Sequence, residues 1–507
     1  MNKFKKFFVS TKLRLLLAFL LNLALTIVAS IYNYLYVYYI ISIVIACVTI
    51  FFLSNRKEKD TYKVTVFLLT MSMPIFGISY AILTKERKGD KKVKKEWANI
   101  LYRNRKTNLP SDESLDSLKH SSVSAYKTGK YLVETIGMPC YDKTDIRYYG
   151  SGEKYFSDLF ETCRKAKKYI LIECYKIKPG KVWWTLFDIL RLKARDGVKI
   201  KLVYDDGVCT KFISNEDFEK MRNHGIETVP FNRMAGLGNS FLNCRNFKRI
   251  VVVDGEVGFM SGFNLTDEYI SMTGDERDIP TKDAGIRFTG LAVRNLIVSF
   301  FEDYQYASKK VIKLQEYFVE GTPSKTKNWI LPYSTNPVSV GHSNKNILLS
   351  MIHNAKESVT ITTTYISLND ELKNALIMAA KSGVDVKVVY CGETETKRVK
   401  ILAKSFFAEL IKDGIHIYEI NNRRMTSRLI IVDNNAAVIS TNNMDCFSTY
   451  KHFNCGVYMF GEVMKDIAKD VSEIVSNAQP VSLKDIQKRK LSEKISASWS
   501  KVIAIFR

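Results

Sequence analysis

Residues Phe247–Asp254 have the sequence Phe-Lys-Arg-Ile-Val-Val-Val-Asp, and residues Thr426–Asp433 have the sequence Thr-Ser-Arg-Leu-Ile-Ile-Val-Asp. In both stretches a cation stands two residues after the first position, and an Asp stands five residues after the cation. An Asn follows ten residues after each Asp, at Asn264 and Asn443. The four consecutive apolar residues in each stretch predict a buried strand. The chain therefore carries one strand-turn-strand unit in two versions.

The similarity between the two versions extends upstream. Matching segments occur in the same order, at residues 165–173, 195–205 and 223–230 before the first version and at residues 354–362, 381–390 and 412–419 before the second. Self-similarity over so long a period is typical of a duplicated unit. We predict two copies of one domain, over residues 131–320 and 321–480.

Each predicted domain alternates amphipathic helical stretches with short apolar runs. Residues 183–196 have apolar side chains at helical spacing, and Gly197 marks the end of that helix. The runs 200–204 and 386–390 are nearly continuous in apolar residues, as expected of strands covered on both faces. The predicted fold class is α/β, with helices sandwiching a mixed sheet in each of two tandem domains.

Three hydrophobic blocks precede these domains, at residues 15–31, 37–53 and 64–83. Each block approaches the ~20 apolar residues that cross a bilayer. No small-residue cleavage site follows, which argues against a removed signal peptide. We predict a helical membrane anchor over residues 1–95, with two or three hydrophobic helices, and a linker over residues 96–130.

Apart from the short uncharged turn at residues 32–36, Lys and Arg residues crowd the flanks of the three blocks. Because such flanks favour the cytoplasmic side, they cannot all be cytoplasmic if all three blocks span the membrane. Either one block is re-entrant or interfacial, or the charge rule is broken once. Pro74 and Gly77 make the third block the candidate for a re-entrant segment. We expect the main body of the protein to face the cytoplasm.

The chain has 507 residues, a formal net charge of +24 and nine Cys without metal-ligand spacing. We interpret the Cys as reduced core residues and expect neither a metal nor a cofactor. So basic a chain favours an anionic partner, either nucleic acid or lipid. The hydrophobic blocks favour lipid, so we expect no nucleic acid.

Residues 481–507 combine basic and apolar side chains at helical spacing. This pattern predicts either an amphipathic tail on an anionic leaflet or a solvated helix.

The repeated unit resembles the His-x-Lys-x4-Asp signature of the phospholipase D superfamily, with each His replaced and each Lys changed to Arg. From residue 10 to about residue 480 the chain is similar to the bacterial cardiolipin synthases of that superfamily. The segments that carry this resemblance are residues 62–80, 137–141, 171–175, 204–206, 257–269, 443–445 and 452–459. The resemblance implies a multi-pass protein of the bacterial cell membrane.

Cardiolipin synthases join two phosphatidylglycerols into cardiolipin and glycerol by double displacement. The resemblance implies that one motif His attacks phosphorus, the other protonates the departing glycerol, and the two Lys neutralise phosphate. Phe247 and Thr426 occupy the two His positions here. Phe247 can do neither task, and Thr426 is unactivated unless a base lies beside it, which no motif position offers.

We therefore predict a site without catalytic residues. By resemblance, Arg249, Arg428, Asn264 and Asn443 are phosphate-binding residues, and Asp254 and Asp433 support the neighbouring backbone. Arg grips phosphate bidentately and stays charged. The alternative is that both Arg residues form ion pairs with neighbouring carboxylates.

Other positions also depart from the family pattern. Phe447 stands where an Arg is usual, Asn454 where a Glu is usual, and Thr281-Lys282-Asp283 where a Trp-x-Asp stretch is usual. Of the six His residues, His452 alone lies in a family-like segment near the second motif, and we interpret it as structural.

Two functional hypotheses follow. The first is a non-catalytic, membrane-anchored, cardiolipin synthase-like protein. Its partner would be an anionic phospholipid such as phosphatidylglycerol or cardiolipin, or a protein such as an active paralogue. The second is a phosphatidyltransferase that still makes cardiolipin with unusual residues.

Overall fold

The computed structural model describes residues 11–54, 60–84, 88–109, 112–232, 244–272, 279–321, 323–337, 343–393, 397–421, 423–445 and 452–487. The described residues divide into two compact units, one running up to Lys95 and a larger one beginning at Glu96.

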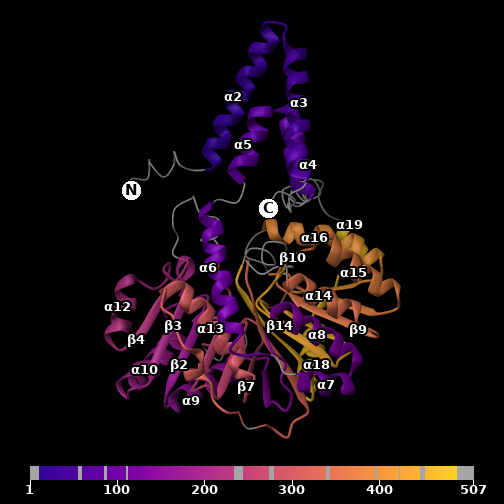
Figure 1. Cartoon of the computed structure of the whole chain (residues 1–507). Helices are drawn as coiled ribbons and strands as arrows, with labels where there is room; N and C mark the ends of the chain where they lie inside the picture. The colour runs from indigo at the N-terminus through magenta and orange to yellow at the C-terminus, as the bar shows by residue number, and fades with distance from the viewer. Residues whose placement is uncertain are drawn as a thin grey trace. The chain divides into compact units, whose positions relative to one another are not determined.

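The N-terminal unit consists of apolar helices (Figure 1). They are α2 (Thr11–Ile31), α3 (Leu35–Ser54), α4 (Asp60–Ser72) and α5 (Pro74–Thr84). Helices α2 and α3 are each long and apolar enough to cross a membrane, and most of their large apolar side chains are exposed. The third hydrophobic block forms two shorter helices, because Pro74 lacks an N–H donor and begins a new helix at its first position.

The segment for which the sequence predicted a linker is mostly helical. It contains most of α6 (Lys88–Arg105), all of α7 (Asp112–Ser121) and the first part of α8 (Val123–Ile136). The Ser122 side chain caps α8 by accepting the Ala125 N–H. Trp97 is fully buried, with its ring centroid 5.1 Å from that of Phe453 in the second domain. The polar outer faces of these helices obscured their apolar inner faces in the sequence.

The first sheet has seven strands in the order β1-β7-β6-β5-β2-β3-β4. Their bounds are β1 (Ile146–Tyr149), β2 (Tyr169–Cys174), β3 (Lys199–Asp205), β4 (Ile226–Phe231), β5 (Ile250–Val253), β6 (Val257–Ser261) and β7 (Gly285–Thr289). Strands β2, β3 and β4 are parallel, and the remaining pairings are antiparallel. The sheet is therefore mixed, as predicted.

The second sheet has eight strands in the order β17-β12-β11-β9-β13-β14-β16-β8. Their bounds are β8 (Asn328–Thr335), β9 (Ser358–Thr363), β11 (Asp385–Cys391), β12 (His416–Ile420), β13 (Leu429–Val432), β14 (Ala436–Ser440), β16 (Asn454–Gly461) and β17 (Gln479–Pro480). Apart from the added β17, the order and directions of its strands repeat those of the first sheet. Strands β10 (Ile366–Ser367) and β15 (Met444–Asp445) form a separate parallel pair.

Helices pack along both sheets (Figure 1). In the first domain they are α9 (Gly152–Arg164), α10 (Lys181–Arg195), α11 (Asp206–Cys209), α12 (Asn215–Asn223) and α13 (Val293–Ser308), with 3-10 turns η2 (Asp267–Tyr269) and η3 (Leu314–Tyr317). In the second they are α14 (Ser343–His353), α15 (Asp370–Lys381), α16 (Lys397–Lys412), α18 (Met464–Ser476) and α19 (Leu483–Gln487). Helix α13 packs against strands of the first sheet and against β8 of the second. The predicted α/β fold is confirmed.

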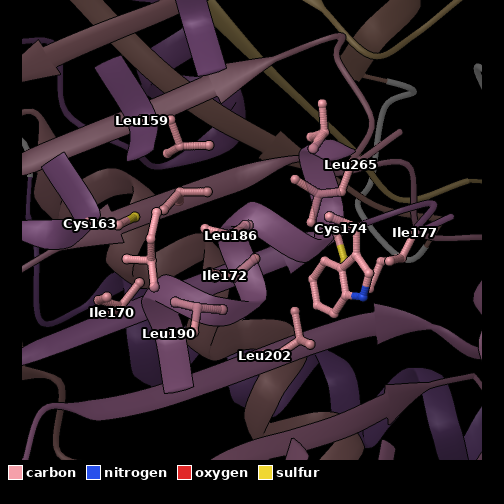
Figure 2. Close-up of a cluster of buried hydrophobic side chains, with 14 of the residues drawn as sticks. Leu159, Cys163, Ile170, Ile172, Cys174, Ile177, Leu186, Leu190, Leu202 and Leu265 are labelled. Carbon is pink, nitrogen blue, oxygen red and sulfur yellow. The ribbon is translucent and has the colours of Figure 1, made fainter. Parts of the chain in front are cut away.

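The core of the first domain lies between its sheet and helices α9 and α10. Figure 2 shows part of it, with labelled side chains from α9 (Leu159, Cys163), β2 (Ile170, Ile172, Cys174), α10 (Leu186, Leu190) and β3 (Leu202). Within the described ranges the cysteines are free thiols, and all but Cys47 are buried. The predicted amphipathic tail falls mostly on residues 488–507, outside the described residues.

Candidate functional site

The two repeated motifs meet along one seam between the domains. Phe247 donates its backbone N–H to the Phe453 carbonyl at 2.8 Å, and Thr426 donates its backbone N–H to the Lys282 carbonyl at 2.8 Å. Parallel bridges join Asn246 to Phe453 and Lys282 to Met425. Each motif therefore begins where its backbone pairs with the opposite domain.

Arg249 is held on three sides and is only 6% exposed. Its Nε donates to Asn264 Oδ1 at 2.8 Å, and its Nη1 donates to the Phe247 carbonyl at 2.9 Å. Its guanidinium carbon lies 5.3 Å from the centroid of the Tyr175 ring, a cation–π distance. Asn264 in turn donates to the Tyr269 hydroxyl at 2.9 Å. The structure thus brings the predicted pair Arg249 and Asn264 together.

Arg428 repeats one of these contacts, because its Nε donates to Asn443 Oδ1. Its Nη1 is buried and has no hydrogen-bond partner among the residues that the structure describes. Burial lowers the pKa of Arg428, Asp283 opposes this effect, and the positive charge of Arg249 lowers it further. The two Arg side chains are therefore close enough for their charges to repel each other. A buried cationic donor without a partner is costly, and an anion would relieve that cost.

Phe247, at the first His position, lies within an aromatic stack. Its ring centroid is 4.3 Å from that of Tyr175, with the two planes inclined by 30°, and 4.7 Å from that of His452. His452 Nδ1 accepts the Arg245 backbone N–H at 3.0 Å. Sequence reasoning placed His452 near the second motif. The structure places it against the first motif, because β16 begins two residues later and the backbone crosses the seam at Phe453.

Thr426, at the second His position, donates its hydroxyl to Asp283 Oδ2 at 2.5 Å. Asp283 is 1% exposed, and burial raises its pKa, although Arg428 and the Thr426 hydroxyl partly offset this effect. A carboxyl group from outside the two motifs therefore lies beside Thr426. This carboxyl group belongs to the Thr281-Lys282-Asp283 stretch, which lies outside both motifs and departs from the family pattern.

A buried charge network behind Phe247 escaped the sequence analysis. Lys248 Nζ lies 2.9 Å from Asp303 Oδ2 on α13. Asn246 donates to Glu173 Oε1 at 2.6 Å and to Asp303 Oδ2 at 2.7 Å. Burial and the neighbouring Asp303 raise the pKa of Glu173 well above its usual range. The sequence signal that could have indicated this network is Glu173, a charged residue within the otherwise apolar strand β2. This network fixes the backbone on both sides of Phe247.

Asp254 and Asp433 lie at the far ends of strands β5 and β13, away from the Arg residues. Both have a left-handed backbone, with φ of 54° and 52°. Asp254 accepts the backbone N–H groups of residues 167–169, and Asp433 accepts those of residues 356–358. Each carboxylate thus anchors the loop that precedes a central parallel strand.

Comparisons with known proteins agree with this architecture. A family model described as "Cardiolipin synthase, PLD-like domain" matches residues 348–477. Cardiolipin synthase 1 of Bacillus cereus is 28% identical over 474 residues, covering 90% of each chain. Over most of its length, this chain is therefore similar to cardiolipin synthases. An uncharacterised protein of Streptococcus mutans is also 28% identical to this cardiolipin synthase-like chain, over 90% of the chain and 99% of that protein.

A solved structure supports the same fold. The phosphatidylserine synthase of Haemophilus influenzae superposes with a TM-score of 0.57 at 12% identity, covering 75% of this chain and 98% of that one. For a cardiolipin synthase-like protein, the two apolar helices α2 and α3 indicate membrane association.

Proposed function

We propose that this cardiolipin synthase-like protein binds an anionic phospholipid headgroup at the seam without turning it over. The observation that carries the proposal is Arg428 Nη1, a buried guanidinium donor with no partner in the described part of the chain. The two motif positions that hold His in the family pattern are occupied by Phe247 and Thr426. The phosphodiester of phosphatidylglycerol or cardiolipin would satisfy this donor. Arg249 and Asn443 would act without contacting the phosphodiester directly. Arg249 would neutralise part of its charge, and Asn443 would hold the Arg428 guanidinium in place.

The electrostatics of the seam support a monoanionic ligand. Arg249 and Arg428 bring two positive charges, and Asp283 brings at most one negative charge. Without a ligand, the two guanidinium groups repel each other in a buried setting. A phosphodiester carries one negative charge. It would therefore balance the excess positive charge of the two Arg side chains without making the site negative.

Phosphatidyl transfer would need a nucleophile that can also depart and a proton donor. The residues at the two His positions of the motifs supply neither. Double displacement through a His passes through a phosphoramidate, from which protonated imidazole departs readily. An ester on Thr426 would instead require an alkoxide to depart, which is as difficult as the departure of glycerol itself. Phe247 carries no proton to assist either departure. Non-catalytic binding is therefore the better-supported function.

One observation favours the second candidate, an active phosphatidyltransferase that makes cardiolipin from phosphatidylglycerol. Asp283 accepts the Thr426 hydroxyl, as a general base next to a nucleophile would. A carboxylate is a weak base for an aliphatic hydroxyl, and the same hydrogen bond equally well satisfies a buried acid. The pair is therefore compatible with both candidates.

The decisive experiment is lipid mass spectrometry after expression of the full chain in a bacterium that lacks all cardiolipin synthases. We expect cardiolipin to stay at the level of the empty-vector control. Headgroup binding is measured in parallel, with purified chain and vesicles of equal charge made from phosphatidylglycerol or phosphatidylserine. Cardiolipin synthesis that disappears with Thr426→Ala would establish the phosphatidyltransferase instead.

For the setting of this site, we propose a multi-pass protein of the bacterial cell membrane whose larger unit faces the cytoplasm. We propose that the two phospholipase D-like domains span residues 131–320 and 321–480. A protein partner such as an active paralogue remains the proposed alternative to lipid. It would be supported by co-purification that persists after Arg428→Ala.

A further inference from the structure

The third hydrophobic block turns back on itself within the N-terminal unit. Only Met73 separates α4 from α5. The Tyr62 hydroxyl, at the start of α4, donates to the Ala81 carbonyl near the end of α5. In a continuous helix these two residues would lie ~28 Å apart along the axis. The block therefore forms a helical hairpin, which is visible as α4 and α5 in Figure 1.

The two legs of this hairpin are in backbone contact near the turn. A methyl group added at Gly77 would lie 2.5 Å from the Thr70 Cα. Thr70 is fully buried, and its hydroxyl donates to the Val66 carbonyl within its own helix at 2.7 Å. Only glycine allows so close an approach at this position. The hairpin is thus tightly packed at its tip.

Each leg is too short to cross a membrane. Helix α4 has 13 residues and α5 has 11. At 1.5 Å per residue these lengths correspond to about 20 and 16 Å, against a hydrocarbon core of about 30 Å. Val64 and Leu68 on α4 and Ile82 on α5 are all more than half exposed. Such apolar surfaces fit hydrocarbon better than water.

Asn22 of α2 holds the tip of the hairpin. Its Oδ1 accepts the Ile75 backbone N–H at 3.1 Å, and its Nδ2 donates to the Tyr38 hydroxyl at 2.9 Å. The Ile75 N–H belongs to the first turn of α5, where no carbonyl of the same helix can accept it. Asn22 is fully buried although it belongs to a helix whose apolar side chains are mostly exposed. It lies near the middle of α2 (Thr11–Ile31), so the tip reaches about half of the depth of that helix.

We propose that α4 and α5 form a re-entrant hairpin that enters the membrane from one face, stops near mid-depth at Asn22, and returns to the same face. With α2 and α3 as the two spanning helices, the start of α2, the end of α3 and both ends of the hairpin then share that face. In the sequence, these helix ends are flanked by basic residues: Lys3, Lys5, Lys6, Lys12, Arg14, Arg56, Lys57, Lys59, Lys63, Lys85, Arg87, Lys88, Lys91, Lys92, Lys94 and Lys95.

The charge distribution supports this topology independently of the hairpin geometry. Three transmembrane passes would place some of these cations on the outer face, against the positive-inside rule. Two passes and a re-entrant hairpin place all of them against one leaflet, where each contributes ~1 kcal/mol of attraction to anionic lipid. The turn between α2 and α3, residues 32–34, carries no charge. The partner of this surface is therefore an anionic leaflet.

The topology is tested by labelling single added cysteines with a membrane-impermeant maleimide, in right-side-out and inside-out membranes. The parent is the full chain with Cys47→Ala, and it serves as the control for labelling of the other native cysteines. Into this parent we introduce, one at a time, Asn33→Cys, Glu58→Cys and Glu86→Cys. These substitutions leave every basic flank intact. We expect positions 58 and 86 to react from one side and position 33 from the other. Reaction of positions 58 and 86 from opposite sides would overturn the proposal.

The fold of the hairpin is tested by cross-linking in the same parent. Tyr62→Cys with Ala81→Cys should be joined within one chain by a short bis-maleimide, whereas a continuous helix would keep the two thiols apart. A lack of cross-linking in a chain that inserts normally would reject the hairpin.

The role of Asn22 is tested by adding Asn22→Leu to that pair, which we expect to reduce the cross-linking yield severalfold. Thr26→Val is the matched control, because the Thr26 hydroxyl donates to the Asn22 carbonyl of its own helix. An unchanged yield with Asn22→Leu would overturn the role assigned to Asn22.

Discussion

Thr426 and Asp283 share a hydrogen bond across the seam between the two domains, with 2.5 Å between their side-chain oxygens. An acid thus remains in place to orient a group at the second His position. Since Thr426 itself is a poor nucleophile, we expect purified wild-type chain in phosphatidylglycerol vesicles to release no glycerol above background. Thr426→Ala should leave that result unchanged.

The same contact predicts a gain of function. An imidazole at position 426 could donate to Asp283, and an imidazole at position 247 would replace one ring by another between Tyr175 and His452. We expect the double variant Phe247→His, Thr426→His to trap phosphoenzyme from labelled phosphatidylglycerol above the wild-type background. Phe247→His with Thr426→Ala is the control. No phosphoenzyme in a folded double variant would show that the site lacks more than its two imidazoles.

Headgroup binding should depend on the two Arg residues in a way that surface charge does not. Arg428→Ala, alone or with Arg249→Ala, is expected to remove any preference for phosphatidylglycerol over phosphatidylserine vesicles of equal charge. Adsorption at low salt should persist, because the remaining basic residues still attract the surface and salt screens that attraction. Lys484→Ala with Lys469→Ala is a charge-matched control. Equal preference in the Arg and Lys variants would contradict a specific site.

Asp205 should make the stability of the protein depend on pH. It is fully buried, and burial raises its pKa to about 6, although Arg245 and the Asn246 N–H oppose this effect. Since an unfolded Asp titrates near 3.9, its protonation stabilises the fold fully below pH ~4 by about 3 kcal/mol, and that stabilisation is lost as the pH rises to about 6.

Replacing Asp205 should flatten this dependence. For Asp205→Asn, thermal unfolding midpoints of the detergent-solubilised chain at pH 4.5 and 6.5 should differ less than in wild type. Asp206→Asn, at the neighbouring position in α11, is the control. A wild-type pH dependence in Asp205→Asn would mean that other groups dominate this range.

The buried network around Lys248 should be sensitive to the removal of one partner. Lys248→Met leaves Glu173 and Asp303 buried without a cation and is expected to cost about 3–5 kcal/mol of unfolding free energy. Adding Asp303→Asn should recover part of this loss, because the excess negative charge is then reduced. Denaturant titration of Lys248→Met, Asp303→Asn and the double variant measures the coupling. Strictly additive losses would contradict an electrostatic network.

Much of the fold could be predicted from the sequence, because strand periodicity and helix-ending glycines are local signals. The strands at 250–253 and 429–432 were predicted on this basis and occur as β5 and β13. The helices between residues 96 and 130 were missed, since their polar faces resemble a linker in composition.

The site was predicted less completely, because its chemistry depends on contacts between distant segments. The pairing of each Arg with its Asn follows from a fixed spacing along one motif and is found in both domains. The contacts of Thr426 with Asp283 and of Phe247 with His452 cross the seam. No spacing within a single motif encodes such contacts, so only the structure could reveal them.

The backbone bonds across the seam have a consequence for how such a protein can change over time. The Phe247 and Thr426 N–H groups pair with carbonyls of the opposite domain, and these bonds do not depend on which side chain stands at either position. An ancestor with imidazoles at both positions could therefore have exchanged them one at a time while the two domains stayed joined. The fold of such a chain can therefore outlast a change of the residues at either motif position.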